Sequence, residues 1–296
     1  MSAILSVPNL SEGRDFGTIE KLRLAASASG SRLLDSSSDI DHNRSVFTIG
    51  GDPAPVVDAV AGLARAALPE IDMSYWSGSH PAVGAIDVAP FVWTGEHARD
   101  ECLEAAAEVA GTLADLGIPV FFYGEMATAP ERRERSWFRR GGLDRLWQRM
   151  SSGDLVADLG PDLPHPTAGA TLVTARPPLA AFNVEIEGGP EGIASTIAAE
   201  IRESGGGPSG LRAIGIDLST GREQVSMNVE DPVSLPLAEV VELVSDLSEE
   251  LGGRAVEAEL IGLIPASAMV DYPAEVPIRG FDPDHHLIEN RLTELE

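Results

Sequence analysis

The alternation of apolar and polar positions divides the chain into short strands and amphipathic helices. Strand-like runs such as AILSVP (residues 3–8) and IPVFFYG (118–124) are separated by segments such as PAPVVDAVAGLARAAL (53–68), in which apolar residues recur at helical spacing. Strands that alternate with helices along the chain are typical of layered α/β proteins. The pattern therefore predicts an α/β fold.

The second part of the chain shows this order most regularly. Its elements follow the order strand, helix, strand, strand, helix, strand, with STG (219–221) as the turn of a central hairpin. This is the βαββαβ order of the ferredoxin-like fold. The first part follows the same order with an added helix and strand. We therefore predict two related α/β sandwiches (an α+β arrangement) at residues 1–178 and 179–296, each with helices on one face of its sheet.

Two stretches of the first part lead to more specific expectations. The run AIDVAPFVW (85–93) is predicted to be a strand, and its interior Pro90 favours an edge position or a bulge because proline cannot donate a hydrogen bond to the sheet. The run ERRERSWFRRGGLDRLWQRM (131–150) is predicted to form one or two arginine-rich helices. Such helices are either amphipathic and ion-paired or form a rim that attracts anions.

The overall charge narrows the class of partner. The 296 residues carry a net charge of −26, which opposes binding to nucleic acids and to anionic membrane surfaces. Lys21 is the only lysine among 21 basic residues, and arginine suits carboxylate binding. The single Cys102 excludes an intrachain disulfide, and the sequence starts without a recognisable signal peptide or an 18-residue apolar run, so we expect a cytoplasmic protein.

Several loops contain candidate chemistry. His80 lies between glycine and proline in SGSHPAVGAIDVAPF (77–91), as either a surface histidine or an acid–base group. The cluster DIDHNRS (39–45) is either an Asx-type turn or a weak candidate for a metal site. In the stiff segment GPDLPHPTAGA (160–170), His165 lies between prolines in a hinge or in a loop that holds a ligand.

One predicted strand has a polar face. Gln224, Ser226 and Asn228 alternate with apolar residues and therefore share one side of the strand, which either lines a cavity or faces solvent. Asn183 is an amide within an apolar strand, so it needs hydrogen-bond partners.

Seven motifs in register resemble the formiminotransferase family over nearly the whole chain: SVPNLSEGR, DHNRSVFTIGG, HPAVGAIDVAPF, IPVFFYGEMA, GATLVTARPPLAAFN, QVSMNV and ELIGLIPASAMVD. The resemblance implies transfer of the formimino group from N-formimino-L-glutamate to tetrahydrofolate as co-substrate, with no metal or redox cofactor. It also implies two subdomains packed around a substrate groove, in a homodimer.

The resemblance also implies site residues. His80 matches the family's catalytic histidine, so it is expected to be the general acid/base. The amidinium of the donor calls for a carboxylate, for which Asp35, Asp39 and Asp41 are candidates and Asp39 is taken as catalytic. The expected substrate-binding residues are Gly160, Pro161, Asp162, Leu163, Pro164, His165, Pro166, Thr167, Ala168, Gly169, Pro265, Ala266, Ser267, Asn183, Gln224, Ser226, Asn228 and Arg44.

The sequence departs from the family pattern in the histidine loop. Relatives usually have Gly-Glu-His-Pro-Arg, whereas this chain has Ser79 and Ala82 at the charged positions. Pro177 and Ser267 replace further residues that are often basic. The alternatives are therefore a different formimino donor, an activity like that of 5-formyltetrahydrofolate cyclo-ligase, transfer to water, or a folate-binding protein without catalysis.

We expect Gly78 to fix the loop through an unusual backbone conformation.

Overall fold

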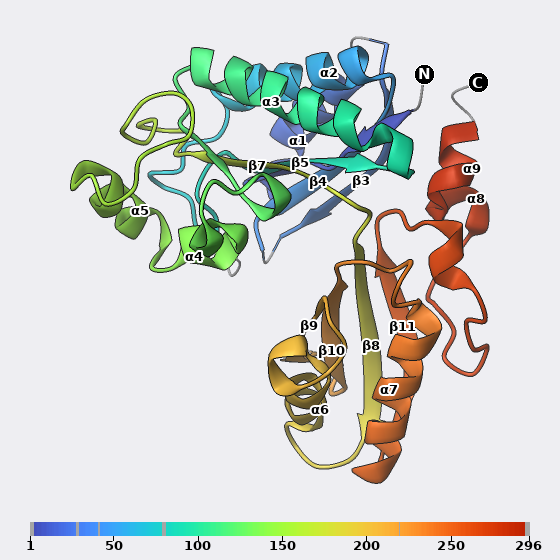
Figure 1. The fold of residues 1–296 in the computed structure, drawn as a ribbon. Coiled ribbons are helices and arrows are strands. Elements are labelled where there is room, and N and C mark those ends of the chain that lie inside the picture. Colours follow the sequence, from blue (N-terminus) through green and yellow to red (C-terminus); the bar gives the residue numbers. More distant parts are fainter. Residues whose placement is uncertain (1–2, 28–29, 41, 79–80, 219, 294–296) are drawn as a thin grey trace. The chain divides into compact units, whose positions relative to one another are not determined.

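A computed structural model describes residues 3–27, 30–40, 42–78, 81–218 and 220–293. The chain forms two compact units, the first ending at Arg176 and the second beginning at Pro177 (Figure 1). Each unit has its own apolar core.

The first unit is built on a seven-stranded sheet. Its strands are β1 (Ile4–Ser6), β2 (Asn9–Leu10), β3 (Arg32–Asp39), β4 (Arg44–Gly51), β5 (Ile86–Trp93), β6 (Val120–Phe122) and β7 (Thr171–Arg176). β3 pairs with β4, β4 pairs with both β1 and β2, and these two pair with β5, all antiparallel. β7 then lies parallel between β5 and β6 and has no counterpart in the predicted order.

Helices cover both faces of this sheet. α1 (Phe16–Ala26), α2 (Pro53–Ala67) and α3 (Arg99–Asp115) pack on one face, whereas α4 (Arg135–Arg139) and α5 (Gly142–Ser151) lie on the other (Figure 1). The prediction of helices on one face is therefore wrong for this unit. The parallel strands are buried on both sides, and Val88, Phe121 and Leu172 form a second core with Phe138 of α4. Short 3₁₀ turns are η1 (Glu96–Ala98), η2 (Gly124–Met126) and η3 (Pro130–Arg133).

Pro90 lies inside the sheet and not at its edge. β5 has partners on both sides, so the edge position expected for its proline is wrong. The register of β2 against β5 shifts where Asn9 is opposite Val88 and Leu10 is opposite Ile86, so this bulge lies at Asp87 and not at Pro90. Val7 N donates to the Pro90 carbonyl at 3.0 Å. The missing N–H of Pro90 therefore faces the break between β1 and β2, where the sheet loses no regular hydrogen bond.

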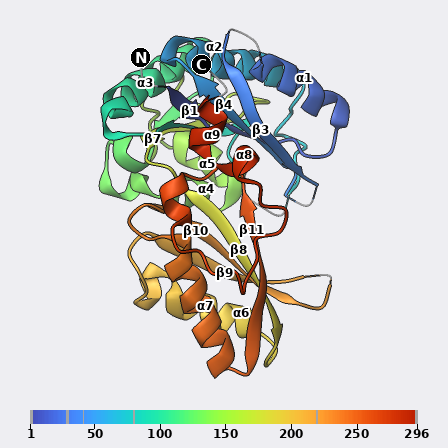
Figure 2. The same cartoon turned by 90° about the vertical axis from the view of Figure 1, so that its right-hand side faces the viewer.

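The second unit has the predicted βαββαβ order. Its elements are β8 (Ala180–Gly188), α6 (Ile193–Ile201), β9 (Leu211–Asp217), β10 (Glu223–Val229), α7 (Leu237–Glu250) and β11 (Gly253–Ile261). The antiparallel sheet has the order β11-β8-β10-β9, and α6 and α7 contribute to a single core with it (Figure 2). The remaining short elements are η4 (Glu203–Gly205), η5 (Ala266–Met269), α8 (Pro283–His286) and α9 (Ile288–Thr293).

Each unit covers its own apolar sheet face. Phe47 and Ile49 of β4 and Phe182 and Val184 of β8 are all 0% exposed within one chain. The apolar strands therefore need no second copy to shield them from water, and the homodimer stays a prediction that rests on the family resemblance alone.

Candidate active site

One end of the first sheet gathers the segments that the sequence singled out. Asp39 at the end of β3 is opposite Arg44 at the start of β4. Leu10 at the end of β2 is opposite Ser45 of β4 and Ile86 of β5. The described parts of the loops over residues 11–14, 39–44 and 76–85 therefore lie at the same end of the sheet.

The segment before His80 is fixed against the hairpin between β3 and β4. Ser79 and His80 lie outside the described residues. The Asn43 side-chain amide donates to the Ser77 carbonyl at 3.1 Å, and Trp76 Nε1 donates to the Asn43 carbonyl at 3.3 Å. These bonds hold the entry to the histidine loop at the hairpin.

Gly78 is required by close packing. Its φ lies outside the left-handed region, so the expected unusual conformation is wrong. A Cβ at this position would overlap the His42 carbonyl oxygen and the Trp76 ring. A side chain at residue 78 would therefore push the histidine loop away from the hairpin.

The segment after His80 pairs with the end of the proline-rich loop. Ala85 N donates to the Ala168 carbonyl and Ala170 N donates to the Val83 carbonyl, both at 2.9 Å. A Cβ at Gly84 would overlap the Ala170 carbonyl oxygen, so glycine permits this close approach. The structure thus places part of the predicted folate segment, residues 160–169, directly beside the predicted catalytic loop.

His165 stabilises the turn of that segment. Its backbone N–H donates to the Gly169 carbonyl at 2.8 Å, and Gly169 N donates back at 2.9 Å. Its Nδ1 accepts from Ala168 N at 3.0 Å, which assigns the proton of a neutral ring to Nε2. Of the two interpretations of this segment, these bonds favour a fixed loop that can hold a ligand, and they do not favour a hinge.

The DIDHNRS cluster forms the Asx-type turn that was one of its two interpretations. Asp39 Oδ1 accepts from His42 N at 2.6 Å, and the Asp39 side chain is 54% exposed. Asp35 lies within β3, and Asp41 lies outside the described residues. Within the described ranges no three His, Cys, Asp or Glu side chains are grouped to hold a metal ion. The catalytic role of Asp39 stays a prediction.

A buried carboxylate that the sequence analysis missed lies at the same end of the sheet. Asp87 is 0% exposed, and its Oδ1 accepts from Val83 N at 2.8 Å. Arg44 and Arg139 both donate to its Oδ2. An aspartate within an apolar strand needs partners by the same argument that singled out Asn183, so the signal was present.

The pKa of Arg44 depends on its burial and on the charged side chains around Asp87. Burial lowers the pKa of Arg44 to about 10, and Arg139 and Arg135 add to this lowering while Asp87 opposes it. Arg44 consequently stays charged at neutral pH. Arg44 is one of the predicted substrate-binding residues. It lies close to the histidine loop, because Asp87 accepts hydrogen bonds both from Arg44 and from Val83 N of that loop.

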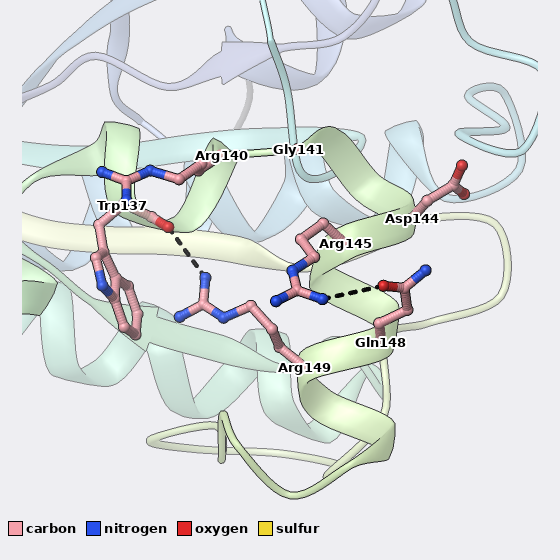
Figure 3. Close-up of a pocket in the computed structure, with 7 residues that line it drawn as sticks. All are labelled: Trp137, Arg140, Gly141, Asp144, Arg145, Gln148 and Arg149. Carbon is pink, nitrogen blue, oxygen red and sulfur yellow. Dashed lines mark hydrogen bonds between the residues drawn. The ribbon is translucent and has the colours of Figure 1, made fainter.

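The predicted arginine-rich helices form a positively charged pocket next to this cluster. A cavity of about 540 Å³ is lined by Trp137, Arg140, Gly141, Asp144, Arg145, Gln148 and Arg149 (Figure 3). Arg149 stacks 3.8 Å from the Trp137 ring centre and donates to the Trp137 carbonyl at 3.0 Å. Burial lowers the pKa of Arg149, and its arginine neighbours lower it further. Three arginines share the pocket with one aspartate, which favours the anion-attracting rim.

The second unit contains the predicted polar strand face. Asn183 of β8 is opposite both Ser226 of β10 and Glu259 of β11, and its amide donates to Glu259 Oε2 at 3.0 Å. The expected need of Asn183 for a partner is confirmed. Gln224 is 7% exposed, whereas Asn228 is half-buried. Carboxylates therefore share the face that the sequence presented as uncharged.

The second predicted folate segment, residues 265–267, lies at the beginning of η5. Pro265 precedes the turn, and Ala266 N donates to Glu289 Oε2 at 2.9 Å. Ser267 follows within the turn. That these residues and the polar strand face contact the same ligand as the first unit stays a prediction.

Within the described residues, no helix has both the length and the apolar character needed to span a membrane.

Comparisons with known proteins agree with the resemblance. A family model described as "Formiminotransferase domain, N-terminal subdomain" matches residues 3–176, and one described as "Formiminotransferase domain" matches residues 181–276. A glutamate formimidoyltransferase of Streptococcus pyogenes serotype M1 is 40% identical over 97% of both chains. One of Thermoplasma acidophilum is 33% identical over 99% of this chain and 98% of its own. A formimidoyltransferase-cyclodeaminase of Gallus gallus is 38% identical over 90% of this chain and 50% of its own.

Proposed function

The chain belongs to the formiminotransferase family, and on that premise we propose that it transfers the formimino group of N-formimino-L-glutamate to tetrahydrofolate. The products are 5-formiminotetrahydrofolate and glutamate. The observation that carries the proposal is the similarity to a glutamate formimidoyltransferase over 97% of both chains.

The reaction requires two proton movements. The folate N5 attacks the amidine carbon and forms a tetrahedral intermediate. The bond from N5 to this carbon therefore forms before the bond from this carbon to the glutamate nitrogen breaks. One proton then leaves N5 and one reaches the departing glutamate nitrogen. An imidazole with a pKa near 6.5 can perform both steps, so His80 is the proposed general acid/base, a role that typically contributes about 10²–10⁴-fold.

The described residues on either side of His80 support this role. Ser77 is bound to the hairpin through Asn43, and Val83 is bound to Asp87 and to Ala170. A loop whose two ends are tied to the sheet restricts where the histidine can lie, which favours orientation of the reacting groups. Asp39 is proposed to bind the amidinium because it ends the strand that enters the hairpin, and the Asn43 side chain of that hairpin binds Ser77 of the histidine loop.

The folate segment is proposed to be residues 160–169, with Asn183, Gln224, Ser226, Asn228 and the segment 265–267 as further contacts. The hydrogen bonds within 165–169 make the first segment a fixed surface. Tetrahydrofolate and formiminoglutamate are the proposed partners, with a second copy of the chain as the proposed partner in a homodimer.

Altered donor specificity is the second candidate. Ala82 is only 4% exposed and packs in the first core, at the position where relatives usually have arginine. The loop therefore lacks one cation that relatives place next to the histidine.

The experiment is an assay of the full chain with formiminoglutamate and tetrahydrofolate, following glutamate and 5-formiminotetrahydrofolate together. The proposal predicts equal amounts of both products. Glutamate release without tetrahydrofolate would indicate transfer to water and contradict it. Turnover only with a different N-formimino amino acid would indicate altered donor specificity.

A further inference from the structure

The cluster of Asp87, Arg44 and Arg139 has an excess of positive charge and is largely buried. The side chains of Arg44 and Arg139 are 13% and 10% exposed, and that of Asp87 is 0% exposed. Among the described residues, these two guanidinium groups form ion pairs with one carboxylate only, which leaves one positive charge uncompensated there. Because burial of a charge is costly unless it is paired, this arrangement favours a further anion.

The two arginines also keep hydrogen-bond donors for such an anion. Both use Nη2 on the same carboxylate oxygen, Oδ2 of Asp87, whose other oxygen accepts from Val83 N. Arg139 Nε is buried and has no hydrogen-bond partner among the described residues. A guanidinium has five N–H donors in a planar fork that matches the two oxygens of a carboxylate.

The cluster adjoins the proposed catalytic loop. Val83, which binds Asp87, follows His80 by three residues, and Arg44 is opposite Asp39 in the hairpin. A group held by these arginines is therefore near the proposed acid–base and amidinium-binding residues. In the donor, the α-carboxylate is two bonds from the nitrogen that departs. In tetrahydrofolate, N5 belongs to the pterin ring, and the methylene bridge and the aminobenzoyl group separate it from the carboxylates, so the donor fits this position better.

We propose that Arg44 and Arg139 form a subsite for one carboxylate of the formimino donor, and that Asp87 orients both guanidinium groups for it. This inference rests on the proposed function and deepens it. The subsite binds the donor before transfer and the same carboxylate of glutamate afterwards.

The test combines arginine substitutions with shortened donors. The variants are Arg139→Gln, Arg139→Lys, and Arg133→Gln as the matched control, because Arg133 is an exposed arginine of the same segment. The donors are N-formimino-L-glutamate, N-formimino-4-aminobutyrate without the α-carboxylate, and N-formimino-L-2-aminobutyrate without the side-chain carboxylate.

With the complete donor, we expect Arg139→Gln to lower kcat/KM by about 10–100-fold, since a charge-assisted hydrogen bond contributes about 1.5–3 kcal/mol. Arg139→Lys retains the charge without the fork and should lie between this variant and wild type. Arg133→Gln should stay within about twofold of wild type, as for an exposed charge. For the donor that lacks the bound carboxylate, wild type and Arg139→Gln should differ by less than about threefold, because the partner group is already absent.

An arginine that only supports the fold would behave differently. Equal losses with all three donors in Arg139→Gln and Arg139→Lys would overturn the subsite, as would no loss with any donor. The donor that shows the small difference identifies which carboxylate is bound.

A binding measurement separates this inference from the proposed function. L-Glutamate is titrated into wild type, Arg139→Gln and Arg133→Gln by calorimetry, with and without tetrahydrofolate. We expect binding to wild type and Arg133→Gln, and at least about tenfold weaker binding to Arg139→Gln. Wild type that binds glutamate without formimino transfer would contradict only the proposed function. Equal glutamate affinity in all three proteins, or none in any, would overturn the subsite.

Discussion

Each unit of the molecule contains a buried carboxylate between two arginines. The two clusters differ in the solvent exposure of their arginine side chains and in their balance of positive and negative charge. In the first unit, Arg44 and Arg139 are 13% and 10% exposed around Asp87. In the second unit, Arg222 and Arg279 are 39% and 50% exposed around Glu185. The two arginines are therefore largely shielded from solvent in the first unit and considerably exposed to it in the second, while both carboxylates are buried.

The second cluster is also balanced by further carboxylates. Arg279 binds Glu257 as well as Glu185, and Arg222 lies 3.7 Å from Glu187. Burial raises the pKa of Glu185, but hydrogen bonds from Arg279 and Arg222 outweigh it and hold the pKa below its ordinary value. This network satisfies its own charges and can stabilise the fold alone. Within the described residues, the charges of the cluster in the first unit are not balanced in this way. This difference distinguishes a proposed binding site from a structural ion network.

The largest expected effect comes from removing the central carboxylates. Asp87→Asn leaves two guanidinium groups unpaired at low exposure, so we expect it to lower the free energy of unfolding by about 3–5 kcal/mol. Glu185→Gln leaves arginines that water can solvate, and should cost about 1 kcal/mol. Urea unfolding of both variants measures the difference. Equal costs for the two substitutions would contradict the comparison.

A double-mutant cycle sharpens the same comparison with a smaller effect. Arg139→Gln in the Asp87→Asn background removes one of the unpaired charges and should recover at least about 1 kcal/mol. Arg222→Gln in the Glu185→Gln background should recover less than about 0.5 kcal/mol, since Arg222 is solvated in both proteins. The coupling energies come from urea unfolding of wild type, the four single variants and the two double variants. A recovery in the second unit as large as in the first would show that burial does not separate the clusters.

The acid sensitivity of Glu185 gives a smaller effect again. Its pKa is lowered in the folded protein, so its ionised form stabilises the fold above the ordinary glutamate pKa of about 4.3. This contribution is lost as pH falls through the lowered value. Unfolding free energies measured between about pH 6 and pH 3 should therefore fall less steeply in Glu185→Gln than in wild type. Identical slopes would show that Glu185 gains nothing from its arginines.

The smallest expected effect concerns the arginine-lined pocket. Arg145 is exposed and hydrogen-bonds Gln148 at 3.2 Å, so its charge acts on ligands mainly through the field around the site. Arg145→Gln should raise the KM for tetrahydrofolate by less than about threefold at low ionic strength, and the difference should vanish at about 0.5 M salt. A difference that persists at high salt would instead indicate direct contact with the folate.

The sequence predicts the second unit better than the first, and the reason is the range of the interactions. The β8-to-β11 pattern depends on local periodicity and a short hairpin, so the βαββαβ order was predictable. β7 pairs in parallel with strands from distant segments, a contact that no local pattern contains. The interior position of Pro90 likewise depends on the break between β1 and β2, which becomes visible only when the strands pair.

The same limit applies to the candidate site. The loops of His80, Asp39 and residues 160–169 were predictable as candidates from residue type and family motif. Asp87 carried the signal of a charge within an apolar strand, but its arginine partners are 43 and 52 residues away, and nothing local selects them from the other arginines. Gly78 was predicted to be important, yet its reason is packing against a carbonyl of another loop.

The most direct test of the proposed transfer is the turnover of His80→Ala against that of His285→Ala, a histidine that is exposed in the second unit. Both variants are assayed with formiminoglutamate and tetrahydrofolate, and their folate dissociation constants are measured in parallel. The proposed role of His80 predicts a fall in kcat of about 10²-fold or more in His80→Ala, with the folate dissociation constant nearly unchanged and His285→Ala like wild type. A His80→Ala protein that turns over within a few-fold of wild type would contradict it.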